Sequence, residues 1–440
     1  MTSAQKQNML EIENVKPQKE ICNYYAPWPI GTLAWSEANS NNPYQFAVGS
    51  LKSELKNHIR IAQLSPEHLY NKNEDDSDFS SVAEGELDFP PTKIKWKPET
   101  GGYQESEFLA TTGDMLRIWE CKNLGLLNDD NCYQKKLNQL FSLNTRPGYV
   151  SPLTSMDWNR FDNRLIITSS VDTTCTVWDV ETQQSKTQLI AHDKEVYDVK
   201  FVTGSTDIFY TCGADGSIRM FDLRSLEHST IVYEEPPQLI TAATNNNGNV
   251  GSSRLASFTP PLLRISTSLL EPNYIATIAL DSNVVSIIDI RFPGTVAATL
   301  LGHTAPISAC EWSPSNRNQL TTSATDSSVF VWDITKSIDE NVGSKQLENL
   351  SNISGGHSIS HGAALGDSYM VQEMEKYSND KGEVTSGVPL PNIYGKVNNV
   401  PSAPFLTYSA KMPVNLLSWN LISQDWVAIA YGYTVQALRL

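Results

Sequence analysis

The chain has 440 residues and a formal net charge of −16 at pH 7. This length exceeds what one compact hydrophobic core usually organises, which favours several domains or a repeat architecture. The acidic balance argues against a protein that grips phosphate backbones, because such proteins present a basic face. We therefore expect no direct binding of nucleic acid.

Cysteine usage and hydropathy indicate the compartment. The six cysteines form no CxxC pair and several lie in apolar segments, as is typical of free cysteines in a reducing environment. Residues 1–20 contain no apolar stretch that could serve as a signal peptide. No segment approaches the ~18 apolar residues that span a bilayer. We expect a cytoplasmic and nuclear protein without membrane contact.

The chain begins with a polar segment, residues 1–20, that we expect to be flexible. Residues 21–26 (ICNYYA) then predict a strand. Seven further alternating segments follow, most of them ending in Trp or another large residue: 32–35, 93–96, 154–158, 196–201, 262–265, 307–312 and 414–419. Several are followed by a second, more apolar strand, as in residues 46–50, 108–112, 165–169 and 208–212.

A short unit recurs after these strands. Residues 169–179 (SSVDTTCTVWD), 213–222 (GADGSIRMFD) and 323–333 (SATDSSVFVWD) each place an Asp six residues before an aromatic, and a second Asp follows directly. The Asp residues are Asp172, Asp215 and Asp326, and the aromatics are Trp178, Phe221 and Trp332. Looser copies occupy residues 112–120 and 279–289. Such repetition predicts small sheets stacked side by side, none of which can bury its faces alone.

Seven first strands, period-2 alternation and Gly, Asp and Asn turns together predict an all-β, seven-bladed β-propeller of four-stranded antiparallel sheets. The ring has to close. Residues 435–440 end the chain one strand short of a complete last blade, so we expect residues 21–26 to supply its outer strand. We expect the propeller, residues 21–440, to be monomeric.

Three segments interrupt the blades. We expect residues 71–86, which are acidic, and residues 234–257, which are rich in Pro, Asn and Gly, to form loops. Residues 337–404 are a low-complexity insertion that we expect to be disordered, because it buries too little apolar surface to offset ordering entropy. Residues 405–410 resume strand character and are predicted as the outer strand of the sixth blade.

The repeats also resemble the WD-repeat pattern, in which His, a strand hydroxyl, Asp and Trp form a buried hydrogen-bonded chain. His192 precedes Asp215 by 23 residues, and His303 precedes Asp326 by the same interval. The resemblance implies that His303, Asp326 and Trp332 complete this chain through Thr322 or Ser323. The copy at His192 lacks its last member, because Phe221 has no N–H to donate.

Several runs resemble one WD-repeat family more specifically: residues 186–199, 213–234 and 271–277, with residues 26–30 (APWPI) and 153–159 in support. This is the Transparent Testa Glabra type, known from anthocyanin regulation in plants, and it is related to the animal WD-repeat scaffold of dual-specificity tyrosine-regulated kinases. The resemblance implies a non-enzymatic scaffold or adaptor that holds a protein kinase, transcription regulators or both. It also implies association with ubiquitin-ligase machinery in animal members.

Residue types that could carry chemistry are explained by the repeats. Asp172, Asp215 and Asp326 recur at equivalent positions, as do His192 and His303, which indicates a structural role. The chain has no nucleophile elbow, Walker loop or zinc-spaced Cys and His set. We expect no catalytic residue, no metal and no cofactor. An enzyme built on this fold would need clustered acids or metal ligands at one mouth of the channel.

Two sets of residues are candidates for partner binding. Arg224 and Arg291 each follow the closing Asp of a unit by two residues, as does the Arg of the W-D-x-R pattern with which WD-repeat substrate receptors dock cullin-type ubiquitin ligases. The alternative is a surface Arg that pairs with the Asp of its own blade. Asp193, Lys194, Glu195 and Tyr197 follow the structural His and are predicted at one mouth of the channel, or else form an ordinary solvated loop. A ligase substrate receptor is the alternative function.

Overall fold

The computed structural model describes most of the predicted propeller. The described residues are 19–37, 43–52, 56–64, 77–98, 106–126, 133–145, 148, 151–241, 255–335 and 403–440. They belong to one compact unit. The predicted flexible residues 1–18 and almost all of the predicted insertion, residues 337–402, lie outside the described residues.

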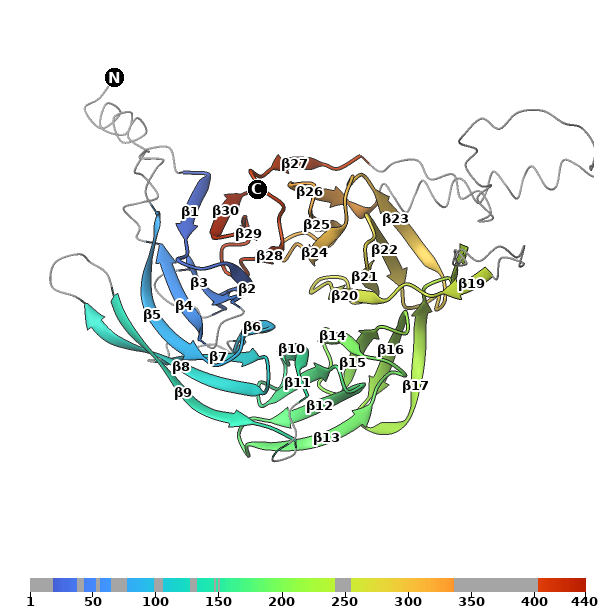
Figure 1. The fold of residues 1–440 in the computed structure, drawn as a ribbon, viewed down its shortest axis with the longest axis horizontal. Helices are drawn as coiled ribbons and strands as arrows, with labels where there is room; N and C mark the ends of the chain where they lie inside the picture. Colours follow the sequence, from blue (N-terminus) through green and yellow to red (C-terminus); the bar gives the residue numbers. More distant parts are fainter. Residues whose placement is uncertain are drawn as a thin grey trace, which may run out of the picture. The chain divides into compact units, whose positions relative to one another are not determined.

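The described residues form seven four-stranded antiparallel sheets arranged in a ring, so the predicted seven-bladed propeller is confirmed (Figure 1). Blade 1 consists of β2 (Ile30–Trp35), β3 (Gln45–Ser50), β4 (Asn57–Leu64) and β5 (Phe79–Leu87). Blade 2 consists of β6 (Lys93–Trp96), β7 (Ser106–Thr112), β8 (Leu116–Leu126) and β9 (Tyr133–Leu143). Blade 3 consists of β10 (Leu153–Trp158), β11 (Leu165–Ser170), β12 (Thr174–Asp179) and β13 (Gln184–Ile190).

The remaining four blades continue the ring. Blade 4 consists of β14 (Val196–Phe201), β15 (Ile208–Gly213), β16 (Ser217–Asp222) and β17 (Ser225–Glu234). Blade 5 consists of β20 (Leu262–Thr267), β21 (Tyr274–Ala279), β22 (Val284–Asp289) and β23 (Val296–Leu301). Blade 6 consists of β24 (Ile307–Trp312), β25 (Gln319–Ala324), β26 (Ser328–Asp333) and β27 (Leu406–Ser409). Blade 7 consists of β28 (Leu416–Trp419), β29 (Trp426–Tyr431), β30 (Thr434–Arg439) and β1 (Ile21–Tyr25).

The core is divided among the interfaces between blades. Each of the seven interfaces has its own hydrophobic cluster, to which both neighbouring sheets contribute. At one of them, Ile167 and Val177 of blade 3 pack with Phe201, Phe209 and Phe221 of blade 4. The second strands are the most apolar because both of their faces are covered, and every residue of β3, β11 and β29 is buried.

The ring closes through β1, as predicted. β1 pairs antiparallel with β30, from Ile21 opposite Leu438 to Tyr25 opposite Thr434. Blade 7 is therefore assembled from segments at opposite ends of the sequence. In blade 6, β27 pairs antiparallel with β26, which confirms the predicted outer strand of that blade.

Two predicted loops are partly wrong. Within residues 71–86, which we expected to be a loop, β5 begins at Phe79 and pairs with β4 along its whole length. Its buried residues, Phe79, Ala83 and Leu87, are four apart, and acidic residues occupy the solvent side. Within residues 234–257, β18 (Gln238–Thr241) pairs with β19 (Leu255–Phe258) as a two-stranded ribbon. Residues 71–76 and 242–254 lie outside the described residues.

Polar side chains of the inner strands link neighbouring blades. Three carboxylates each accept a hydrogen bond from a backbone N–H of the next inner strand: Asp157 from Phe201 (2.9 Å), Asp198 from Ile265 (3.1 Å) and Glu311 from Trp419 (2.9 Å). Three hydroxyls donate to carbonyl oxygens of the next blade: Thr92 to Leu153 (2.7 Å), Thr154 to Val196 (2.6 Å) and Ser308 to Val414 (2.6 Å). These side chains satisfy backbone groups on the channel edge of the sheets, which has no further strand.

Closure of the ring can be tested on two adjacent tyrosines of β1. Tyr24 is 3% exposed and packs edge-on against Phe46 of blade 1, with ring centroids 5.6 Å apart. Tyr24→Ala should therefore lower the free energy of unfolding by about 3–5 kcal/mol in chemical denaturation. Tyr25 is 47% exposed, so Tyr25→Ala should change it by no more than about 0.5 kcal/mol. Equal effects at the two positions would contradict the closure.

Candidate functional site

The antiparallel order of the strands determines which loops share a face of the propeller. The connection that enters each inner strand and the turn between the second and third strands lie at one end of the sheet, which we call the top face. The other two turns of each blade lie on the bottom face. Asp193, Lys194 and Glu195 are therefore on the top face, whereas Arg224 and Arg291 are on the bottom face.

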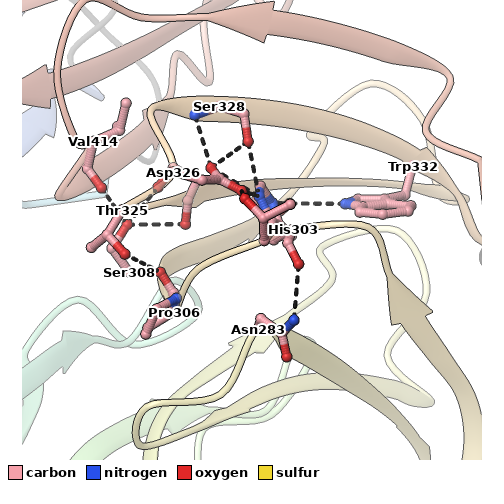
Figure 2. Close-up of polar contacts among 12 residues, drawn as sticks. Asn283, His303, Pro306, Ser308, Thr325, Asp326, Ser328, Trp332 and Val414 are labelled. Atoms are coloured by element: carbon pink, nitrogen blue, oxygen red, sulfur yellow. Dashed lines mark hydrogen bonds and ion pairs between the residues drawn. The ribbon is translucent and has the colours of Figure 1, made fainter.

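Blade 6 contains a complete chain of hydrogen bonds from the top face to its interior (Figure 2). Nδ1 of His303 lies 3.1 Å from Oδ2 of Asp326, and its Nε2 lies 2.7 Å from Oγ1 of Thr322. The indole N–H of Trp332 donates to the same hydroxyl at 2.8 Å. Of the two hydroxyls open in the sequence, the structure thus places Thr322 in the chain. Every buried polar group of this chain has a partner.

The chain also determines the protonation of its members. Burial acts to raise the pKa of Asp326, but hydrogen bonds from Ser328, Thr304 and His303 outweigh it and lower the pKa to about 2. Burial lowers the pKa of His303, and the neighbouring Asp326 offsets this only in part. The carboxylate is therefore ionised and the imidazole neutral near pH 7. The hydroxyl of Thr322 is fully buried and also accepts the indole N–H of Trp332, so the chain holds the turn to the interior of the blade.

Blade 4 has the upper part of the same chain. Nδ1 of His192 lies 2.9 Å from Oδ1 of Asp215, and its Nε2 lies 2.7 Å from Oγ1 of Thr211. The Trp is replaced by Phe221, which stacks on Phe209 with ring centroids 5.3 Å apart. Burial acts to raise the pKa of Asp215, but hydrogen bonds from His192 and Ser217 hold it well below its usual range.

In blade 3 no His takes part in the corresponding hydrogen-bonded chain. Its repeat residues bond only to groups within their own blade. Asp172 accepts hydrogen bonds from the backbone N–H (3.2 Å) and hydroxyl (2.6 Å) of Thr174. The intervening Thr173 adopts a left-handed conformation with φ of 73°, so the Asp turn is tight. The indole N–H of Trp178 donates to Thr168 at 2.9 Å. The geometry gives both residues a structural role in their own blade.

The contribution of the buried chain can be measured with two histidines. His303 is 3% exposed, whereas His228 lies on the exposed outer strand β17. His303→Ala should lower the free energy of unfolding by about 2–4 kcal/mol, because it opens a cavity and leaves Asp326 and Thr322 short of a partner. His228→Ala serves as the control and should stay within about 0.5 kcal/mol in the same denaturation experiment. A His303→Ala protein as stable as the control would refute the structural role.

The pKa of Asp326 predicts a dependence of stability on pH. Because the folded pKa (about 2) is below the unfolded value, its contribution is fully present above about pH 4 and is lost as the pH falls towards 2. Between those values, the free energy of unfolding of Asp326→Asn should fall less than that of wild type, by on the order of 1–2 kcal/mol. Asp281→Asn, at an exposed top-face turn, should follow wild type. Parallel curves for Asp326→Asn and wild type would contradict the assignment.

The predicted top-face residues of blade 4 are accessible. Asp193, Lys194 and Glu195 are exposed, and Tyr197 is partly buried in β14. Arg219 of β16 donates to both Asp193 (2.9 Å) and Asp215 (3.1 Å) and thereby ties the loop to the buried chain. This contact holds a charged loop in a defined position, as recognition loops on rigid scaffolds are held.

The top face also carries exposed apolar side chains that the sequence analysis missed. We call them the apolar arc: Met412 at the entry to blade 7, Tyr433 in blade 7, Leu51 in blade 1 and Phe89 at the entry to blade 2. Between 52% and 57% of each residue is exposed. Their signal in the sequence is a large apolar residue in a turn, where strand periodicity does not require one.

Backbone contacts hold neighbouring parts of this arc together. The segment that connects β1 to β2 accepts a hydrogen bond from Leu51, through Pro29 O at 2.8 Å, and donates one to Tyr433, from Ala26 N at 2.8 Å. The side chain of Met412 lies beside Gly432, which belongs to the same turn as Tyr433. The arc thus runs over consecutive blades, and the charged loop of blade 4 lies across the ring from it (Figure 1).

On the bottom face, both predicted docking arginines pair with the Asp of their own blade. Nη2 of Arg224 lies 2.6 Å from Asp222, and Nη2 of Arg291 lies 2.7 Å from Asp289. Both side chains remain more than half exposed. Arg224 also holds the pKa of Asp222 at about 2. The pairing presents each guanidinium in a fixed orientation while leaving it accessible, and Phe292, 65% exposed, lies beside Arg291.

The described residues offer neither a cluster of metal ligands nor a thiol of lowered pKa. No group of three or more His, Cys, Asp or Glu side chains there could hold a metal ion. The described cysteines are free, and burial raises the pKa of Cys22 and Cys121 to about 12, which keeps these thiols protonated near pH 7. No helix in the described part of the chain is long and apolar enough to cross a membrane. Cys132, His357 and His361 lie outside the described residues.

The fold and the repeated hydrogen-bonded chain define a WD-repeat β-propeller protein. The family model "WD domain, G-beta repeat" matches residues 140–179, 183–222 and 294–333, which contain the three strict copies of the repeat. The chain is 35% identical over 423 residues to the DDB1- and CUL4-associated factor 7 homolog of Dictyostelium discoideum, covering 96% of this chain and 99% of that relative. The chain therefore belongs to the family of WD-repeat proteins that includes this homolog.

Two yeast relatives extend the family. The chain is 36% identical over 423 residues to an uncharacterized WD repeat-containing protein of Schizosaccharomyces pombe, covering 96% of this chain and 90% of that relative. It is 33% identical over 437 residues to a WD repeat-containing protein of Saccharomyces cerevisiae, covering 96% and 77%. None of these three relatives is named as a protein of the Transparent Testa Glabra type, so that finer resemblance remains a prediction.

Proposed function

We propose that this protein is a non-enzymatic adaptor that holds protein partners on the top face of its propeller. The observation that carries the proposal is the apolar arc on a rigid scaffold. Large apolar side chains that gather at an exposed surface mark interaction sites, and aromatic residues such as Tyr433 and Phe89 are typical anchors of such sites.

The two sides of the top face suit different parts of a partner. The arc offers apolar surface that a partner would remove from water, whereas the loop of Asp193, Lys194 and Glu195 offers charges of both signs. Charged groups at the rim of an interface contribute more to specificity and association rate than to affinity. We infer that the arc provides most of the affinity and the blade 4 loop the selectivity.

The partners we propose are a protein kinase, transcription regulators or both, in the cytoplasm and nucleus. Support comes from the resemblance of residues 186–199 and 213–234 to the WD-repeat scaffold of dual-specificity tyrosine-regulated kinases. These residues include β17, the outer strand of blade 4, and the top-face loop of that blade. The likeness therefore covers accessible parts of the propeller as well as its core.

The top-face proposal is tested by adding charge to the arc. Leu51→Asp together with Tyr433→Asp should reduce the capture of a purified dual-specificity tyrosine-regulated kinase by at least ~tenfold, as expected when a central apolar contact is lost. Phe161→Asp is the control, because Phe161 is 59% exposed on the bottom face. The Phe161→Asp variant should capture the kinase as well as wild type does. A double variant that captures the kinase as well as wild type would rule out docking on the arc.

The alternative function is that of a substrate receptor for a cullin-type ubiquitin ligase. It is supported by the relative from Dictyostelium discoideum, whose name describes a factor associated with DDB1 and CUL4. It is supported equally by Arg224 and Arg291, which present two similarly oriented guanidinium groups on the bottom face. The two functions use opposite faces and are therefore compatible in one molecule.

The receptor function is tested by charge reversal on the bottom face. Arg224→Glu combined with Arg291→Glu should reduce the capture of purified DDB1 by at least ~tenfold, because each guanidinium would be replaced by a repelling carboxylate. Arg164→Glu is a matched control: Arg164 is 56% exposed on the same face and pairs with Asp162 at 2.9 Å. Undiminished capture by the double variant would eliminate docking through these arginines.

A further inference from the structure

The channel at the centre of the ring contains charges that the adaptor function does not use. It encloses a cavity of about 220 Å³ lined by the inner strands of all seven blades. Two rings of side chains line it, one residue and three residues before the last residue of each inner strand. The first position holds Lys95, Asp157, Lys200 and Glu311, and the second holds Lys93, Asp198 and Arg264.

The carboxylates of the channel are engaged by neighbouring groups. Asp157 accepts the N–H of Phe201 and lies 3.4 Å from Nζ of Lys95. Asp198 accepts the hydroxyl of Ser155 at 2.6 Å as well as the N–H groups of Val199 and Ile265. These oxygens therefore link neighbouring blades as well as attracting the cations of the channel.

Three cations of the channel lie farther from the carboxylates than ion-pair distance. Within the described residues, Lys93, Lys200 and Arg264 form no ion pair with a carboxylate, in contrast to Lys95, which has both Asp157 and Glu37 within 4.0 Å. Arg264 donates one bond, to the carbonyl of its neighbour Leu263 at 2.8 Å. Asp198 is the one carboxylate in the ring of Lys93 and Arg264, whereas Lys200 lies in the ring of Asp157 and Glu311.

These cations affect one another across the channel. Burial and the positive charges of Lys200 and Arg264 lower the pKa of Lys93 to about 8, and the attraction of Asp198 does not offset this. Burial acts to lower the pKa of Lys200, but Asp157, Asp198 and Glu311 outweigh it and raise that pKa. The two rings together hold four cations and three carboxylates, an excess of one positive charge inside a protein whose formal net charge is −16. An anion placed among the three side chains would relieve their repulsion and supply acceptors for their N–H groups.

We propose that the channel is a binding site for a small phosphate anion, held by Lys93, Lys200 and Arg264. A phosphate group offers several oxygens to donors that converge from different blades, and the guanidinium of Arg264 can bind two of them at once. The cavity is enclosed by seven strands, so its ligand is a small molecule and not a protein segment. Inorganic phosphate and a small phosphate monoester share the required chemistry.

The site is tested by isothermal titration of the purified full chain with inorganic phosphate, and separately with glycerol 3-phosphate, at matched ionic strength. Lys93→Gln with Arg264→Gln should weaken binding at least ~tenfold, because two charged hydrogen-bond donors to the anion are lost. Lys186→Gln, on the exposed outer strand β13, is the control and should bind within about twofold of wild type. Circular dichroism establishes that each variant is folded.

Comparison of the two titrations identifies the source of the phosphate group. Binding of inorganic phosphate alone assigns a free ion, and binding of both ligands assigns a site that also accepts a monoester. Failure of both to bind wild type at millimolar concentration overturns the proposal, as does equal binding by the double variant. If the double variant does not fold, an unchanged melting temperature of wild type in phosphate relative to chloride is the contradicting result. The outcome is independent of which protein docks on either face.

Discussion

Each sheet of this ring is stable only because a neighbouring sheet covers each of its faces. The seven hydrophobic clusters lie between blades, so no blade has a core of its own. The inner carboxylates Asp157, Asp198 and Glu311 add directed bonds across three of these interfaces. Hydrophobic packing therefore provides most of the stability, and the polar contacts determine how each blade is placed against the next.

The sequence predicted most of the fold, because the repeat spacing and strand alternation are local signals. His303 and Asp326 were assigned to one hydrogen-bonded chain from their spacing together with the resemblance to the WD-repeat pattern, and their side chains meet in the structure. β5 was missed because three of its nine residues are exposed and two of these, Glu84 and Glu86, are acidic, so its composition resembles that of a loop. Nor could the sequence distinguish Thr322 from Ser323, since the choice depends on which side of the sheet each side chain points to.

The candidate binding surfaces were harder to predict for a physical reason. The apolar arc is made of Leu51, Phe89, Met412 and Tyr433, which come from three blades and share the top face only when the ring has closed. The same holds for Lys93 and Arg264, which come from different blades. A pattern along the chain shows what a residue does within its own strand or turn. Which residues share a face or a channel follows from the arrangement of the blades.

The position of β1 has a consequence for how the protein matures. β1 pairs with β30, which comes far later in the sequence, so β1 must wait until β30 has been synthesised and has left the ribosome. Until then Trp35 and Phe46 of blade 1 lack their cover from blade 7, and this apolar surface is open to chaperones or to self-association. Contacts between residues so distant in sequence form slowly, which makes closure the expected rate-limiting event of folding.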